Sequence, residues 1–187
     1  MSEISQVRPP FGGDVQGAGT VSTASGIAVS EGGDDINHIT TLTLTDFAVG
    51  SSTGAAALAF GALLYTLPAG IQIIEAVHVS VALTGTAPIV ADTPDVGIGS
   101  VVASGVVSVL GGTATFEDYV TGQTSGAISG ANTITAFLSA TAGALTGIAL
   151  NKTADVKAIY LNCADTWADA GDVTATGTIK IIWKTIS

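Results

Sequence analysis

Few side chains in this sequence could carry out chemistry. It contains two histidines, His38 and His78, and a single cysteine, Cys163. A zinc site needs three or four nitrogen, sulfur or carboxylate ligands, and a nucleophilic triad needs a base beside a serine or cysteine. These residues are too few for either arrangement. We therefore expect both histidines to be hydrogen-bonded structural residues and Cys163 to be a small buried hydrophobic residue.

Aspartates offer a second kind of chemistry, because calcium prefers oxygen ligands such as carboxylates. They gather in three predicted loops: Asp34 with Asp35, Asp92 with Asp95, and Asp165 with Asp169 and Asp172. The last group does not have the spacing of an EF-hand loop, and no glutamate follows where a bidentate ligand is needed. We expect solvated loop carboxylates and no cofactor. Calcium bound by Asp165, Asp169 and Asp172 is the alternative.

Carbohydrate chemistry is a third option. Trp167 lies close to Asp169, and its ring could stack on a sugar, although a loop tryptophan more often anchors packing or an interface. A glycosidase needs two carboxyl groups facing each other across a cleft. Glu75 and Glu117 are the only glutamates of the strand-rich region, and nothing in the sequence brings them together. We predict that the protein is not an enzyme.

The distribution of charge excludes several partners. Between Pro9 and Asn151 the sequence has ten acidic residues and no lysine or arginine. Such a surface repels phosphate backbones, so we expect no nucleic-acid partner. The chain is 47% hydrophobic and 11% charged, and its net charge of −10 keeps it dispersed. Assembly into an oligomer would bury further apolar surface.

A membrane partner is not expected either. The longest apolar run, residues 54–64, is about half of the roughly 20 residues that a membrane-spanning helix needs. Residues 1–6 have neither the basic nor the apolar region of a secretory signal. We therefore expect synthesis in a cytoplasm.

The elements that position these residues are predicted to be strands preceded by an arm. Arg8-Pro9-Pro10-Phe11 cannot be helical, because proline keeps the residue before it out of the α region. The following residues, up to position 36, are rich in glycine, serine and threonine and have too little apolar surface to fold alone. We predict an extended N-terminal arm over residues 1–36 and one domain over residues 37–187.

Alternating apolar and polar residues predict the strands of this domain. Residues 37–49 alternate threonine with apolar residues, the pattern of a half-buried strand. Further strands are predicted at residues 58–67, 71–83, 95–102, 106–110, 114–119, 133–139, 156–162 and 173–184. The first two flank a Pro-Ala-Gly turn, so we predict a β-hairpin over residues 58–83. Lys180 and Lys184 are predicted to face solvent. About eight strands predict an all-β, antiparallel β-sandwich, most simply a jelly roll.

Three features are similar to one group of known proteins. They are the Pro- and Gly-bearing arm, the strand block around residues 64–70 (LYTLPAG), and residues 91–99 (ADTPDVGIG). In these the chain resembles the cement or decoration proteins of tailed-bacteriophage heads, over most of residues 37–187. The resemblance implies a jelly-roll fold and a homotrimer on the outer surface of a virion capsid, made in the host cytoplasm. The implied partner is the major capsid protein, whose neighbouring subunits the arm would clamp.

Five residues are the predicted partner-binding positions: Arg8, Pro9, Pro10, Phe11 and Trp167. The first four would anchor the arm, since arginine and aromatic residues are favoured at interfaces; a disordered tail is the alternative. Two other functions compete with capsid decoration. A carbohydrate-binding β-sandwich, such as a fibre or adhesin head, would use Trp167 and the nearby aspartates. A capsid subunit would need a basic surface facing a genome, which the sequence lacks.

Overall fold

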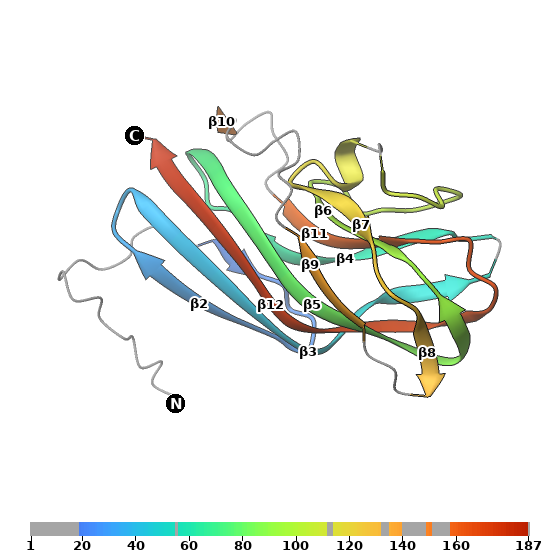
Figure 1. Ribbon diagram of the computed structural model, residues 1–187. Helices are drawn as coiled ribbons and strands as arrows, with labels where there is room; N and C mark the ends of the chain where they lie inside the picture. The colour runs from blue at the N-terminus through green and yellow to red at the C-terminus, as the bar shows by residue number, and fades with distance from the viewer. Residues whose placement is uncertain are drawn as a thin grey trace.

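The computed structural model describes residues 19–54, 56–111, 114–131, 135–139, 149–150 and 158–186. Within them the chain is almost entirely antiparallel β-structure, arranged as two packed sheets (Figure 1). The predicted antiparallel β-sandwich is thereby confirmed. Helical structure in this part of the chain is limited to one 3-10 turn, η1 (Ala114–Phe116). No helix among the described residues is long and apolar enough to cross a membrane.

One sheet has five strands. Their spatial order is β1 (Thr20–Val21), β4 (Ala59–Thr66), β11 (Ala158–Ala164), β6 (Asp95–Gly99) and β7 (Val120–Thr124). All neighbouring strands are antiparallel. The central strand, β11, pairs with β4 on one side and with β6 on the other.

The second sheet has seven strands. Its main path runs through β10 (Ala149–Leu150), β5 (Ile71–Asp92), β12 (Ala170–Ile186), β3 (Asn37–Thr53) and β2 (Ile27–Gly33). Two further strands, β8 (Ile128–Ala131) and β9 (Thr135–Ser139), also pair with β5. The long strand β12 pairs with β3 and β5 over most of its length.

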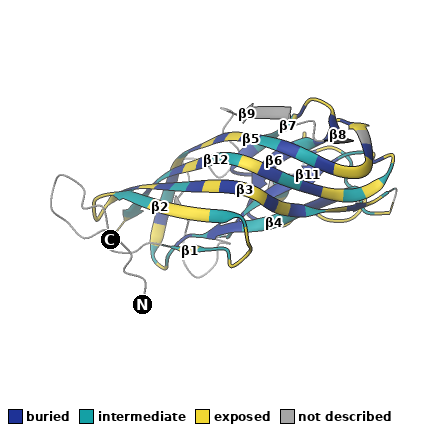
Figure 2. Cartoon of the chain, turned by 90° about the horizontal axis from the view of Figure 1, so that it is seen from below, coloured by how far each residue is buried: buried dark blue, intermediate teal, exposed yellow. Residues whose placement is uncertain are grey.

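The hydrophobic core lies between the two sheets and follows from the alternation of side chains along the strands (Figure 2). The alternation in β3 changes phase at Asp46: Leu44 is buried before it and Phe47 after it. The extra residue lies in β3: Leu44 pairs with Gly177 (φ 147°) and Phe47 with Ala175, so Thr45 and Asp46 (φ 48°) together lie opposite Thr176 as a β-bulge. A Cβ atom on Gly177 would lie 2.2 Å from the carbonyl oxygen of Ser80, so only glycine fits there.

The predicted hairpin over residues 58–83 is wrong. β4 belongs to the five-stranded sheet and β5 to the seven-stranded sheet. The turn between them therefore carries the chain from one sheet to the other. Both segments have the composition of strands, but an apolar pattern does not say which strand is the neighbour.

The predicted strands at residues 106–110 and 114–119 are also absent. Residues 100–111 are irregular, and η1 follows. Side chains satisfy the backbone of this segment: the amide of Ala103 donates to Asn162 Oδ1 (2.9 Å), and the amide of Leu110 donates to Asp95 Oδ2 (3.1 Å). An apolar run does not need a ladder of strand hydrogen bonds when side chains supply the partners.

Part of the predicted arm belongs to the sandwich. Two strands lie within residues 19–36, the described part of this segment: β1 pairs with β4, and β2 pairs with β3 along its whole length. β2 ends in two glycines and is mostly exposed, and its backbone pairs with β3. That contact is tertiary, so the local composition of residues 27–33 did not reveal the strand.

Candidate functional site

The acidic loop between β11 and β12 does not gather its carboxylates around one point. Asp165 accepts hydrogen bonds from the backbone amides of Thr93 (2.8 Å) and Thr166 (2.7 Å). Asp172 instead accepts one from the hydroxyl of Ser51. Among the described residues, no group of three histidine, cysteine or acidic side chains could hold a metal ion. Asp165 and Asp172 thus have separate hydrogen-bond partners.

A different set of carboxylates lies close together at this end of the sandwich. The pKa of Asp165 is raised, mainly because burial penalises its charged form and further because Asp92 and Asp95 are near. Asp92 Oδ1 accepts from the amide of Ala168 (3.1 Å), whereas its Oδ2 is buried without a hydrogen-bond partner. Asp95 accepts from Leu110 N and, at 2.6 Å, from Thr124 Oγ1. These carboxylates tie loops to strands and concentrate negative charge.

Trp167 lies in the core. Its side chain is 3% exposed, its Nε1 donates to the carbonyl oxygen of Leu58 (2.9 Å), and its ring stacks on Phe60 with centroids 5.2 Å apart. It is therefore a packing residue and offers no free ring face to a sugar or a partner. This removes the aromatic residue on which the carbohydrate-binding alternative depends.

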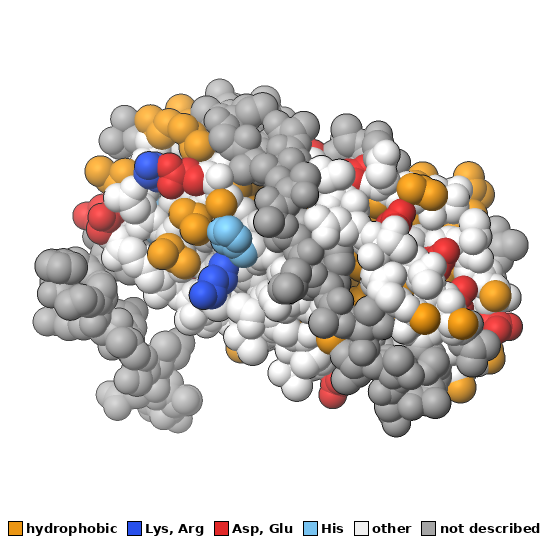
Figure 3. Space-filling view, viewed as in Figure 1, with side chains coloured by type: hydrophobic (Ala, Val, Ile, Leu, Met, Phe, Trp, Pro, Cys, Tyr) orange, Lys and Arg blue, Asp and Glu red, His pale blue; other side chains and the backbone are white. Residues whose placement is uncertain are grey.

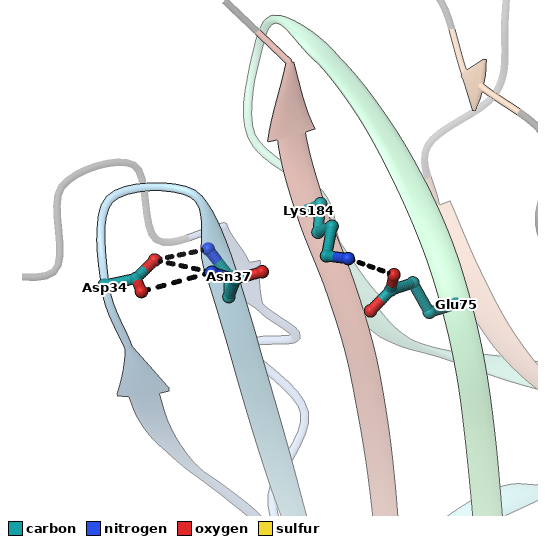
Figure 4. A network of polar contacts seen from close by, with 4 residues as sticks. All are labelled: Asp34, Asn37, Glu75 and Lys184. Carbon is teal, nitrogen blue, oxygen red and sulfur yellow. Dashed lines mark hydrogen bonds and ion pairs between the residues drawn. The ribbon is translucent and has the colours of Figure 1, made fainter.

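The two glutamates considered as a glycosidase pair lie in different parts of the sandwich, Glu75 on β5 and Glu117 between η1 and β7. Glu75 on β5 forms an ion pair with Lys184 on β12, with 2.5 Å between Oε1 and Nζ (Figure 4). Glu117 is buried beside the five-stranded sheet, where it accepts a hydrogen bond from the amide of Gly122 (2.6 Å). Each carboxylate has its own partner.

Cys163 and His38 are both fully buried. The prediction made for Cys163 is confirmed, whereas the one made for His38 is not. Cys163 is fully buried on β11, and burial raises the pKa of its thiol to about 12, so it is an inert core residue as predicted. His38 is also fully buried, but neither ring nitrogen has a hydrogen-bond partner. The prediction of a hydrogen-bonded His38 is therefore wrong. His78 lies exposed on β5.

A buried polar network joins the two sheets, and the sequence did not indicate it. Tyr65 on β4 donates to Glu31 Oε1 on β2 (2.6 Å) and accepts from the amide of Gly19 (2.6 Å). Thr40 on β3 donates to Glu31 Oε2 (2.8 Å) and accepts from Trp183 Nε1 on β12 (2.9 Å). Burial, together with the Glu31 carboxylate, raises the pKa of Tyr65, so the phenol stays protonated. The network holds strands together and contains no activated nucleophile.

The turn between β2 and β3 is closed by Asp34. Its Oδ1 accepts hydrogen bonds from the amides of Asn37 (2.6 Å) and Ile36 (2.9 Å), and both carboxylate oxygens accept from the Asn37 side chain (Figure 4). These hydrogen bonds lower the pKa of Asp34. The acidic Gly-Gly-Asp-Asp sequence is thus a turn in which the carboxylate replaces missing backbone partners.

Exposed apolar side chains gather in two places and are the strongest candidates for binding surfaces. The first, which we call the isoleucine face, is formed by the exposed Ile39, Ile71 and Ile186 and the half-buried Ile182 on the seven-stranded sheet. The second, the valine loop, is residues 100–111, whose exposed side chains are Val101, Val102, Val106 and Val109. Both could bind protein surfaces through apolar contact. Arg8, Pro9, Pro10 and Phe11, the predicted anchor, lie outside the described residues.

Comparison with known proteins found no relative of this chain. The chain matches no protein-family model, no curated protein sequence and no solved structure.

Proposed function

We propose that the protein is a non-enzymatic structural protein of a tailed-bacteriophage virion, a decoration protein that binds the outer surface of the head and stabilises it. The proposal starts from the resemblance of the arm and of residues 64–70 and 91–99 to such proteins. The resemblance implies a jelly roll, and the observation that carries the proposal is the order of the strands.

The order of eight described strands within the two sheets supports a jelly roll. Counted along the chain they are β3, β4, β5, β6, β7, β9, β11 and β12. One sheet contains the first, eighth, third and sixth, in the order β3-β12-β5-β9, and the other contains the second, seventh, fourth and fifth, in the order β4-β11-β6-β7. This is the order produced by two Greek keys wound together, an architecture frequent in viral capsid proteins. It supports the jelly-roll assignment.

The chemistry of the surface supports a protein partner. The chain has a net charge of −10, which disfavours phosphate-rich partners, and it exposes the isoleucine face and the valine loop. Repetition of one chain over a capsid lattice would let weak contacts act together through avidity.

The test is co-sedimentation with heads assembled from the major capsid protein encoded in the same genome. We expect the full chain to sediment with the heads and to raise the temperature at which they disrupt. A chain lacking residues 1–18 tests the predicted anchor, because this deletion ends before β1 and leaves both sheets intact. The matched control keeps the arm and replaces only Arg8 and Phe11 by alanine.

Two results would contradict the proposal. One is a protein that stays in the supernatant at every ratio to heads. The other is binding to a glycan array in the absence of head binding, which would favour the carbohydrate-binding alternative. If the full chain binds and the truncated chain binds equally well, the arm is not the anchor and the folded sandwich makes the contact.

A further inference from the structure

The carboxylate of Asp92 has one oxygen that nothing in the described chain contacts through a hydrogen bond. Asp92 is the last residue of β5 and is 8% exposed. Its Oδ1 accepts from the amide of Ala168 (3.1 Å), whereas its Oδ2 is buried away from water and has no hydrogen-bond partner among the described residues. A buried carboxylate oxygen costs free energy unless a proton donor or a cation meets it. The described residues therefore leave this side chain unsatisfied.

Asp92 and Asp165 each hold the loop that carries the other. Asp165 Oδ2 accepts from the amide of Thr93, the residue after Asp92 (2.8 Å), and Asp92 accepts from the amide of Ala168, in the loop that begins with Asp165. The two carboxylates are thereby fixed between the turn that joins β5 to β6 and the loop that joins β11 to β12. Figure 1 shows the chain passing from β11 to β12 at the end of the sandwich far from the C-terminus.

Asp95 adds a third carboxylate at the same end. It is the first residue of β6 and pairs with Ala164, the residue before Asp165. After burial itself, the nearness of Asp92 and Asp95 contributes to the raised pKa of Asp165. Both oxygens of Asp95 already accept hydrogen bonds, one from a backbone amide and one from a threonine hydroxyl. Asp95 therefore adds negative charge beside the other two carboxylates.

No positive side chain of the described residues balances this charge. Lys180 and Lys184 are the lysine and arginine residues of that part of the chain. Lys180 pairs with His78, fourteen residues before Asp92 along β5, and Lys184 forms its ion pair with Glu75. In Figure 3 the lysine side chains lie on one half of the visible face, whereas the other half shows acidic side chains and no described lysine or arginine. Buried charges in proteins are paired or coordinate a metal ion, and here the pairing side chain is missing.

We propose that a calcium ion binds between Asp92 and Asp165, with Asp92 Oδ2 as one of its ligands. Calcium combines carboxylates with backbone carbonyls and water. It therefore does not require three acidic side chains around one point, an arrangement that the described residues do not provide. Magnesium keeps several of its water molecules, whereas Asp92 Oδ2 is out of contact with water, so calcium suits this oxygen better.

This site differs from the calcium alternative that the sequence suggested. That alternative includes Asp172, which accepts a hydrogen bond from Ser51. In the proposed site the ion joins two connections between strands, and its binding stabilises the folded chain. With two carboxylates as ligands we expect a Kd on the order of 10⁻⁴–10⁻³ M, the range of extracellular calcium modules. The proposal does not depend on binding to phage heads.

The first test is thermal unfolding of the full chain in EDTA and in about 10 mM calcium chloride. We expect calcium to raise Tm by about 3–10 °C, because the ion binds the folded chain and not the unfolded one. Sodium chloride of equal ionic strength controls for screening of the net charge, and magnesium chloride controls for the choice of ion; both should raise Tm less. An unchanged Tm in calcium, or an equal rise in sodium chloride, would overturn the proposal.

Two variants with the same change of charge locate the effect. Asp92→Asn keeps the shape of the side chain and removes the buried charge, so in EDTA it should be at least as stable as the wild type. It should show none of the rise in Tm with calcium. Asp172→Asn is the matched control, since Asp172 is exposed at the start of β12, and it should keep the full rise. A rise that survives in Asp92→Asn, or one that is lost in Asp172→Asn, would contradict the proposed ligands.

Terbium luminescence places the ion without relying on stability. Terbium replaces calcium at oxygen sites and emits when a neighbouring tryptophan is excited. Trp167 lies in the loop between Asp165 and Ala168, so terbium at the proposed site should emit strongly. Excess calcium should remove the emission, and Asp92→Asn, shown to be folded by circular dichroism, should lack it. Equal emission from the wild type and Asp92→Asn would show that the metal binds elsewhere.

Discussion

The rings of His38 and Trp183 stack face to face, with their centroids 3.9 Å apart and their planes 6° from parallel. They lie opposite each other on β3 and β12, on the side of the sheet that faces the core. Trp183 has a hydrogen-bond partner in Thr40, whereas both nitrogens of His38 have none. His38 therefore contributes to this structure as a flat ring and not as a polar group.

This arrangement predicts that an apolar ring can replace His38. We expect His38→Phe to change the free energy of unfolding by less than about 1 kcal/mol, because stacking is kept and no hydrogen bond is lost. His38→Ala should lower it by about 2–4 kcal/mol through loss of packing. Urea denaturation measures both, with the exposed His78→Ala as the control. Equal losses in His38→Phe and His38→Ala would mean that the nitrogens do have partners.

The buried network predicts a loss of stability at alkaline pH. The pKa of Tyr65 is raised in the folded protein, so the stabilisation is complete below the ordinary tyrosine pKa of about 10 and is lost as the pH rises above it. Denaturation midpoints between pH 8 and pH 11, in the wild type and in Tyr65→Phe, measure this effect. The variant should be less stable near pH 8, by about 1–3 kcal/mol, and should lose less stability above pH 10. Parallel pH profiles would contradict it.

Asp118 predicts the same direction of pH dependence for a carboxyl group, in a lower pH range. Burial raises its pKa despite the hydrogen bonds from Ser100, so its charged form is unfavourable in the folded state. Asp118→Asn keeps an acceptor for the Ser100 amide and removes the buried charge. We expect it to be at least as stable as the wild type at pH 7, whereas Asp118→Ala should lose about 1–3 kcal/mol.

The pH profile provides the check on Asp118. Because its folded-state pKa is raised, lowering the pH from 7 toward 4 should stabilise the wild type relative to Asp118→Asn. Thermal unfolding of the two proteins across this range measures the difference. A constant difference between them would show that the carboxyl group titrates alike in the folded and unfolded states.

The three hydrogen bonds of Asn162 to the backbone predict that this side chain stabilises the valine loop. Asn162→Leu would leave three backbone groups of residues 101–116 without their partners, so we expect a loss of about 3 kcal/mol or more. Elastase should then cleave the loop at its exposed valines much faster than in the wild type. Asn37→Ala, in the exposed turn after β2, is the control for an asparagine that holds a different segment. Unchanged cleavage would mean that the loop does not depend on Asn162.

The alternation of apolar and polar residues along the sequence was sufficient to predict several strands of the fold. The alternation over residues 37–49 and 173–184 predicted β3 and β12, because the direction of a side chain in a strand depends only on its position along that strand. The same rule placed Lys180 and Lys184 toward solvent. Composition alone predicted that Cys163 would be buried.

The tertiary structure decided which strands pair and which polar groups meet. The two sheets separate β4 from β5, although a turn joins them, because pairing depends on the apolar surfaces of strands far apart in the sequence. Glu31 and Tyr65 are 34 residues apart and share a hydrogen bond that no local pattern encodes. Trp167 lies in the loop after β11, as the sequence indicated, but its side chain is buried in the core and donates a hydrogen bond to Leu58. Side-chain direction is a property of neighbouring residues, whereas burial and partnership are properties of the assembled sheets.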